Sequence, residues 1–424
     1  MNKKYYESIN ETLFNFKCDN GLEVYLLKKE DYYKTYALFA TRFGSLNTKF
    51  NSNGKEHSVI DGAAHFLEHK MFEKEGYDVM NLFSAQQASS NAFTSFDKTA
   101  YLFSATANIE RNIETLLDFV QDLELSDESV EKEKPIIASE IAMYDDDPDW
   151  QSLFQSLQAL YHNNPIKVDI AGTKETVYSI SKEDLFTYHE NFYHPSNMTL
   201  FVCGNFDIDT IAQVIENNQN AKEFKKLEIE AINVEELNDI AHEFINKEMD
   251  VSDIKVNYSF KVNEYLFEPL KQDLTMSILQ DILFAKSSDF YQDLVKEQKV
   301  SDQYSYHYSQ DVRHNYAFIT FSFATDDKEY LIKYLDDFFA QDIKKYISEE
   351  EFNVVKAKYV GDFIRLFNNP ESIANSFIQY HFMNFDLFNV LNVIDTITID
   401  DLNTITKLYN KDYRAITSIS PKEK

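Results

Sequence analysis

One ten-residue stretch, residues 63–72, constrains the fold of this chain more than any other part of the sequence. It contains no glycine or proline, and its spaced apolar side chains predict a mostly buried helix. His65 and His69 stand four positions apart, so a helix places both imidazoles on one face, one turn from each other. Glu68 follows three residues after His65 and reaches the same side. The spacing therefore predicts a helix that presents two metal-binding side chains beside a carboxylate.

The order His-x-x-Glu-His is the inverted form of the commoner zinc-protease helix motif and is the signature of inverzincins. Two imidazoles are half of a tetrahedral zinc site, and Glu68 is close enough to touch a water bound to that metal. The alternative is a helix whose two histidines are only packed or solvated. In a chain with 10 His the triple arises by chance on the order of once in a hundred sequences. The motif therefore favours zinc and requires a third ligand.

A third ligand is available in residues 129–143, which also predict a helix with an apolar stripe. Glu133 and Glu140 stand seven positions apart, which is two turns, so both carboxylates point the same way. Two His and one Glu with an open fourth position are typical of catalytic zinc, whereas structural zinc is usually closed by Cys. We predict Glu140 as the third ligand and Glu133 as a group that orients a histidine. The alternative is that both are solvated helix charges, and Pro135 between them predicts a kink.

The composition limits the class of protein. At 424 residues the chain exceeds what one hydrophobic core usually serves, so two domains are the default. The net charge of −30 argues against nucleic acid and anionic membrane surfaces as partners. No stretch approaches the roughly 18 unbroken apolar residues of a membrane span, and residues 1–8 lack the apolar segment of a secretory signal. Cys18 and Cys203 are far apart, which fits a reducing compartment, so we expect a cytoplasmic protein.

Strand-like and helix-like segments alternate in both halves of the chain. In the first half we predict strands at 22–27, 35–43, 91–96, 99–104 and 198–202, with helices between them. In the second half we predict strands at 254–262, 304–308 and 317–323, and helices at 268–285, 328–347, 349–367, 370–382 and 399–409. This α+β order predicts three ranges: a zinc-binding catalytic domain 1–225, a linker 226–250 rich in Glu, Lys and Asn, and a C-terminal domain 251–424.

Together these residues resemble the pitrilysin/insulysin family of zinc peptidases, which includes mitochondrial processing peptidase. The likeness rests on the motif of residues 65–69 and on the pair of glutamates that follows it. Residues 91–101 are similar to the family's N-A-x-T block, and residues 193–207 to its helix–loop–strand block. The resemblance is strong over roughly the first 210 residues, weaker beyond them, and points to the small bacterial members.

The resemblance implies two similar α/β-sandwich halves, each a mixed, largely antiparallel sheet with helices packed on one face. It also implies how a peptide substrate is held. The strand at 90–94 would be an exposed sheet edge to which the peptide adds as a further strand, with Asn91 and Ala92 lining the cleft beside the zinc. The alternative for this segment is a plain core hairpin.

In this family an Arg and a Tyr in the second half usually stabilise the oxyanion, within a pattern like L-R-E-x-x-G-L-x-Y. Here Val295 aligns with the Arg and Asp302 with the Tyr. Valine cannot donate a hydrogen bond, and an aspartate repels the developing negative charge. Tyr304 or Tyr306 would substitute after a shift of two or four residues, and the next arginine is Arg313.

The expected function is that of a zinc endopeptidase subunit. His65, His69 and Glu140 would bind Zn²⁺, and Glu68 would take a proton from the metal-bound water and pass it to the leaving amine. Because the usual oxyanion donors are missing, we expect a paralogous partner chain to supply them in a heterodimer.

Three alternatives to this expectation stay open. A homodimer in which Tyr304 or Tyr306 serves as the oxyanion donor is the second choice of assembly. A non-catalytic peptide-binding or scaffold subunit of the same fold is the second choice of function. The third is a zinc protein that binds peptides without cleaving them. The intact motif argues against the scaffold, and retention of Glu68 argues against the last.

Overall fold

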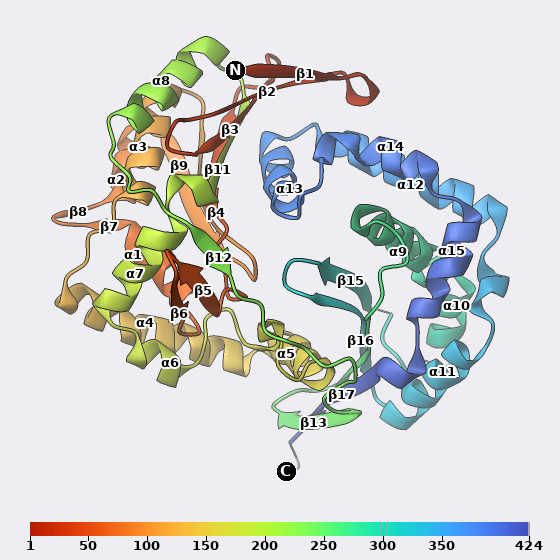
Figure 1. The fold of residues 1–424 in the computed structure, drawn as a ribbon. Helices are drawn as coiled ribbons and strands as arrows, with labels where there is room; N and C mark the ends of the chain where they lie inside the picture. The colour runs from red at the N-terminus through yellow and green to blue at the C-terminus, as the bar shows by residue number, and fades with distance from the viewer. Residues whose placement is uncertain (297, 303, 423–424) are drawn as a thin grey trace. The chain divides into compact units, whose positions relative to one another are not determined.

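The computed structural model describes residues 1–296, 298–302 and 304–422 (Figure 1). The chain divides into two compact units, each built around its own sheet. Unit 1 comprises Met1–Ile141, Val168–Ile232 and Ile364–Asn389, and unit 2 comprises Ala142–Lys167, Asn233–Phe363 and Val390–Lys424. Each unit therefore takes one segment from the other half of the sequence. The predicted ranges 1–225, 226–250 and 251–424 follow the chain instead, and as independently folding domains they stay a prediction.

The sheet of unit 1 has the strand order β1-β2-β3-β11-β4-β10-β9. Its strands are β1 (Asn2–Tyr6), β2 (Glu11–Lys17), β3 (Glu23–Lys28), β11 (Met198–Gly204), β4 (Thr35–Thr41), β10 (Thr99–Ala105) and β9 (Ala88–Thr94). Neighbours run antiparallel apart from the parallel pair β3–β11, among the strands the structure describes. β9 lies at one edge, whereas β4 and β11 are buried along their whole length.

Helices cover both faces of this sheet (Figure 1). The helices of this part of the chain are α1 (Ala63–Met71), α2 (Val79–Ala85), α3 (Ile109–Gln121), α4 (Asp127–Asp146), α6 (Lys174–Ser179), α7 (Lys182–Phe192), α8 (Ile208–Asn220) and α13 (Pro370–Phe382). Tyr101 packs on α3, and Phe201 packs on α13. These two side chains pair with Phe39 and Leu38, which are successive residues of β4, so they lie on opposite faces. Helix α13, from the second half of the sequence, thus covers the face opposite α3.

Unit 2 repeats this plan with the strand order β13-β17-β14-β16-β15. Its strands are β13 (Phe244–Met249), β17 (Arg414–Pro421), β14 (Ile254–Lys261), β16 (Tyr316–Thr325) and β15 (Ser305–Asp311). Its helices are α5 (Pro148–Leu160), α9 (Pro269–Phe284), α10 (Asp289–Lys296), α11 (Lys328–Ala340), α12 (Glu349–Leu366), α14 (Val390–Thr396) and α15 (Ile399–Ile405). Helix α5, from the first half of the sequence, packs on β14 and β17, as α13 packs on β4 and β11.

The expected fold class, two similar halves with mixed, largely antiparallel sheets, is confirmed by these strand orders. Helices were expected on one face of each sheet, but in unit 1 a helix from the second half of the sequence, α13, covers the other face as well. The stretch expected as a linker is more structured than predicted. It contains β12 (Ile229–Ala231), which pairs with β5 (Lys49–Ser52), and β13, which pairs with β17. Both strands are largely exposed, so their sequences lack the apolar alternation that marks a half-buried strand. No helix in the described ranges is long and apolar enough to cross a membrane.

Candidate metal centre

Helix α1 is held in place by its apolar side chains. Ala64, Phe66, Leu67 and Met71 are buried in unit 1. The residue just before the helix is Gly62, whose φ of 88° favours glycine, and a side chain there would collide with the backbone of Ala171. Packing and a close backbone approach therefore fix the direction in which the helix presents its polar face.

The structure brings His65, His69 and Glu140 together. Nε2 of His65 lies 3.6 Å from Oε1 of Glu140, and Nε2 of His69 lies 3.4 Å from Oε2 of the same carboxylate. One ligand atom from each of the three residues lies within 4.8 Å of the others. Ligand atoms about 2.1 Å from a tetrahedral zinc ion are about 3.4 Å apart, so this donor set fits Zn²⁺. The observed spacing supports the predicted ligands, whose metal binding stays a proposal.

Glu133 lies behind His69, and its predicted role as the group that orients this histidine stays a proposal. Its Oε1 accepts a hydrogen bond from Nδ1 of His69 at 3.0 Å, which leaves Nε2 of the neutral ring without a proton and directed at the ligand cluster. Pro135 does not interrupt α4, which runs unbroken from Asp127 to Asp146 and keeps both carboxylates on one side. The contact that a kink would have disturbed is therefore present.

Lys70 completes this arrangement, and the sequence did not identify it. Its side chain is 1 % exposed, and its amine contacts Glu133 at 3.3 Å and also Glu73. The only signal was a lysine among the apolar residues of a buried helix, which requires a charged partner.

Burial and the neighbouring charges set the protonation of the two histidines differently. Burial, together with the nearby His69 ring, lowers the pKa of His65 to about 4. Burial also acts to lower the pKa of His69, but its hydrogen bond to Glu133 and the carboxylates around it outweigh this effect and raise that pKa. The hydrogen bond from His69, together with Lys70, lowers the pKa of Glu133. His65 is thus neutral, the form that binds a metal, and Glu133 is ionised.

Glu68 lies in the same helix and contacts the sheet. Its Oε2 accepts a hydrogen bond from Oγ1 of Thr94, the last residue of β9, at 2.7 Å. Burial raises the pKa of Glu68, and the bond from Thr94 opposes this rise. A carboxylate with a raised pKa beside a candidate zinc site suits a group that takes and returns a proton. Thr94 belongs to the N-A-x-T block, but only the structure shows this contact.

Asn91 and Ala92 lie where the sequence placed them. Both belong to β9, the edge strand of the sheet, and pair with Leu102 and Tyr101 of β10. Asn91 is exposed and Ala92 is partly exposed. The same strand ends at Thr94, next to Glu68, so a chain added to this edge would pass close to the metal centre.

The candidate oxyanion donors of the second half are engaged elsewhere in unit 2. The hydroxyl of Tyr304 donates to the backbone carbonyl of Phe284, and the hydroxyl of Tyr306 donates to Oδ1 of Asp281 at 2.8 Å. Either tyrosine would have to give up its partner in order to bind an oxyanion.

Val295 and Asp302, which align with the family's Arg and Tyr oxyanion donors, also lie in unit 2. Val295 is in α10, and Asp302 is exposed, with its backbone carbonyl accepting a hydrogen bond from Tyr291 at 3.2 Å. Arg313, the next arginine, forms an ion pair with Asp311 at 3.0 Å. Asp302 and Arg313 therefore both contact other residues of unit 2.

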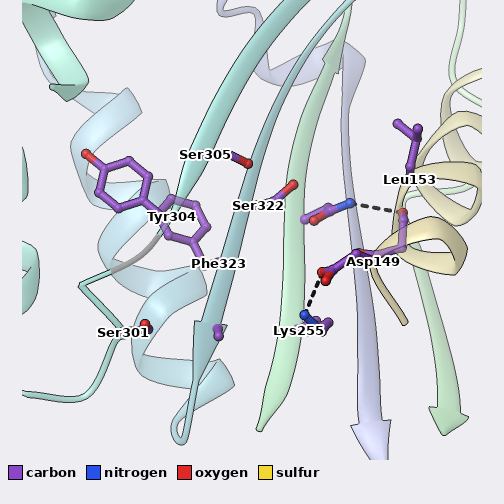
Figure 2. A pocket seen from close by; sticks show the side chains of 11 residues that line it. Asp149, Leu153, Lys255, Ser301, Tyr304, Ser305, Ser322 and Phe323 are labelled. Atoms are coloured by element: carbon purple, nitrogen blue, oxygen red, sulfur yellow. Dashed lines mark hydrogen bonds and ion pairs between the residues drawn. The ribbon is translucent and has the colours of Figure 1, made fainter. Parts of the chain in front are cut away.

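A cavity of about 530 Å³ lies on the sheet of unit 2, beside α5 (Figure 2). Lys255 pairs with Asp149 on one side of it, and the amide of Asn257 donates to the carbonyl of Ser152. The ring of Tyr304 lies on the other side. The sequence gave no sign of this cavity, because its small polar residues are scattered over α5, β14, β15 and β16.

Two family descriptions match the chain. Residues 54–174 match "Insulinase (Peptidase family M16)", and residues 179–359 match "Peptidase M16 inactive domain". The first range contains all of the residues predicted for the metal centre and for peptide binding.

Individual proteins match over nearly the whole chain. The uncharacterized zinc protease YmfH of Bacillus subtilis is 39 % identical over 427 aligned residues, 98 % of this chain and 98 % of YmfH. The solved structure of a protein described as an M16-like peptidase, from Alicyclobacillus acidocaldarius, has a TM-score of 0.92 and 36 % identity, with 97 % of this chain and 99 % of that chain covered. The periplasmic protease PqqL of Escherichia coli shares the fold at 16 % identity, with a TM-score of 0.71. That match covers 100 % of this chain and 48 % of PqqL, so the fold accounts for about half of PqqL.

Proposed function

Because this chain belongs to the insulinase family of peptidases, family M16, as its motifs predicted, we propose that it is the zinc-binding subunit of an endopeptidase. The observation that carries this proposal is the convergence of three ligand-type side chains beside a partly buried carboxylate. His65, His69 and Glu140 would hold Zn²⁺, and Glu68 lies one helical turn away from the first of them.

The chemistry divides between the ion and the chain. Zinc supplies Lewis acidity, which lowers the pKa of water and polarises the peptide carbonyl. Glu68 takes a proton from the attacking water, whose oxygen bonds to the carbonyl carbon. When the C–N bond breaks, Glu68 returns that proton to the leaving amine. Glu133 holds His69 with Nε2 directed at the ligand cluster throughout.

The substrate is proposed to be an extended peptide that pairs with β9. An edge strand offers unpaired backbone groups, and adding a strand there holds a peptide without a preformed deep pocket. Asn91 and Ala92 would contact the peptide beside the metal centre. Unpaired thiols at the buried Cys18 and Cys203 support a reducing compartment, so the proposed location is the cytoplasm.

A paralogous partner chain is proposed to supply the oxyanion donors. The support is that Tyr304 and Tyr306 both donate their hydroxyl protons within unit 2. A homodimer that uses either tyrosine would first have to break these bonds. The fold of this chain accounts for about half of PqqL, which agrees with a working unit larger than one such chain.

Metal analysis tests the ligands directly. The wild-type protein should bind about one zinc per chain, and His65→Ala/His69→Ala should lose it, because three protein ligands are typical of a catalytic site. His57→Ala/His194→Ala, which removes two histidines outside the cluster, is the matched control and should keep zinc. Unchanged zinc in the first double variant would overturn the assignment.

A scaffold subunit of the same fold is the second candidate. It is favoured by the match of residues 179–359 to an inactive domain and by the engaged tyrosines of unit 2. Mixing the zinc-loaded chain with candidate paralogues and a peptide library separates the two functions. Hydrolysis in a mixture supports the peptidase, hydrolysis by the chain alone excludes the need for a partner, and zinc binding without hydrolysis in any mixture favours the scaffold.

A further inference from the structure

The hydroxyl of Thr94 is the side-chain donor to Glu68 that the described residues show. Oγ1 of Thr94 lies 2.7 Å from Oε2 of Glu68, and the two residues come from different elements, β9 and α1. A carboxylate has two oxygens with about four lone pairs between them, and this bond takes one lone pair of Oε2 while Oε1 keeps both of its own with respect to this hydroxyl. The contact therefore holds one oxygen of Glu68 against β9 and sets the orientation of the carboxylate.

The surroundings of Thr94 fix the direction of this hydrogen bond. Thr94 pairs across the hairpin with Thr99, whose Oγ1 lies 3.4 Å from that of Thr94. Thr99 is fully buried, and its hydroxyl donates to the backbone carbonyl of Phe43 at 2.9 Å. Each hydroxyl carries one proton, so the proton of Thr94 is the one directed at Glu68.

Both the side chain and the backbone of Thr94 restrict the position of its hydroxyl. Thr94 is β-branched, which restricts its first side-chain torsion angle. The hairpin closes directly after it, because the amide of Ser95 donates to the carbonyl of Lys98 at 2.8 Å. The donor is thus fixed by covalent branching and by the turn that follows.

We propose that Thr94 is a positioning residue for the reaction, because it anchors one oxygen of Glu68 and leaves the other oriented to accept the proton of the attacking water. This inference rests on the proposed role of Glu68. It adds that β9 performs two tasks, since the strand proposed to pair with the peptide also holds the base. Binding of substrate and orientation of the base then depend on the same edge strand.

Removing only the hydroxyl tests this role. Thr94→Val keeps the shape and branching of the side chain, and kcat should fall about 10- to 100-fold, the usual effect of a misplaced catalytic group. KM, zinc content and the unfolding temperature should stay at their wild-type values. Thr94→Ser retains the hydroxyl and should recover most of kcat. Thr187→Val is the matched control, because among the described residues that hydroxyl donates to the carbonyl of Glu183 in its own helix, and the kcat of this variant should not change.

Two further measurements separate this inference from the proposed function. If Glu68→Gln retains wild-type kcat, the base assignment fails and the role of Thr94 fails with it. If Glu68→Gln is inactive while Thr94→Val has wild-type kcat, only the role of Thr94 is overturned. A crystal structure of metal-free Thr94→Val should show the carboxylate of Glu68 in a new orientation, and an unchanged carboxylate would also overturn the inference.

Discussion

We expect Lys70→Met to destabilise unit 1, because this substitution removes a buried charge without changing the volume of the side chain. The amine of Lys70 lies 3.3 Å from Oε2 of Glu133. At that distance, and with an effective dielectric constant of about 20, the attraction is about 5 kcal/mol. Relief of the desolvation of the buried ammonium offsets part of this loss. The contact with Glu73 adds little, because that carboxylate is 55 % exposed.

The net loss in the free energy of unfolding should be about 2–4 kcal/mol, since His69 still partners the carboxylate of Glu133. Urea unfolding of the metal-free protein measures it. Lys132→Met is the matched control. It removes a lysine of α4 whose ion pair with Glu128 is 71 % and 77 % exposed, and its effect should be under about 0.5 kcal/mol.

A double-mutant cycle decides whether the pair with Glu133 is the cause. In a Glu133→Gln background the carboxylate that Lys70 neutralises is gone, so Lys70→Met should have a smaller effect than in the wild type. If the two effects simply add, or if Lys70→Met is as stable as Lys132→Met, the reasoning about this buried pair is refuted.

Three further predictions concern the metal centre and unit 2. Glu68→Gln should keep zinc and still bind peptide while hydrolysis falls roughly 10²-fold or more, which activity assays and zinc analysis of the same sample would check. Glu133→Gln should lower the affinity for zinc by about 10- to 100-fold, and Glu140→Gln should lower it further, as measured by competition with a chelator. Equal zinc affinities of the two variants would contradict the assignment of Glu140 as a ligand and Glu133 as a supporting group. Asp311→Asn should lower the free energy of unfolding by about 2–4 kcal/mol at pH 7. Burial raises the pKa of Asp311, but the bonds from His314 and Arg313 outweigh it and hold that pKa well below its usual value. Because the pKa of Asp311 is lower in the folded than in the unfolded state, its ionised carboxylate contributes its full stabilisation above about pH 4. This contribution is lost as the pH falls through the folded-state pKa, so the unfolding free energies of the variant and the wild type should converge in acid.

The metal helix could be predicted because its information is local. A spacing of four places His65 and His69 on one helical face whatever surrounds them, and a spacing of seven does the same for Glu133 and Glu140. That the two helices face each other is not local information. That expectation came from the resemblance to the family, and the structure shows the distances between the side chains of the two helices.

The missed features depend on contacts between distant parts of the sequence. Nothing in residues 148–160 or 370–382 shows which sheet each helix covers, because an apolar helix face suits either. The strand β13 was missed for a different reason. It lies at the edge of its sheet with most of its side chains exposed, so it carries no apolar alternation.

The two units share a sheet order, but only unit 1 has the candidate metal centre among the described residues. In both, an edge strand is joined to its neighbour by a short loop, residues 95–98 after β9 and residues 312–315 after β15. The last residue of β9 is Thr94, which bonds to Glu68, whereas the last residue of β15 is Asp311, which bonds within its own loop to Arg313. Helix α9 is the first helix after β14, as α1 is the first helix after β4, and it contains no histidine. The repeated sheet order therefore fixes where an edge strand and a helix meet, and the side chains at that meeting point decide whether a metal centre is built there.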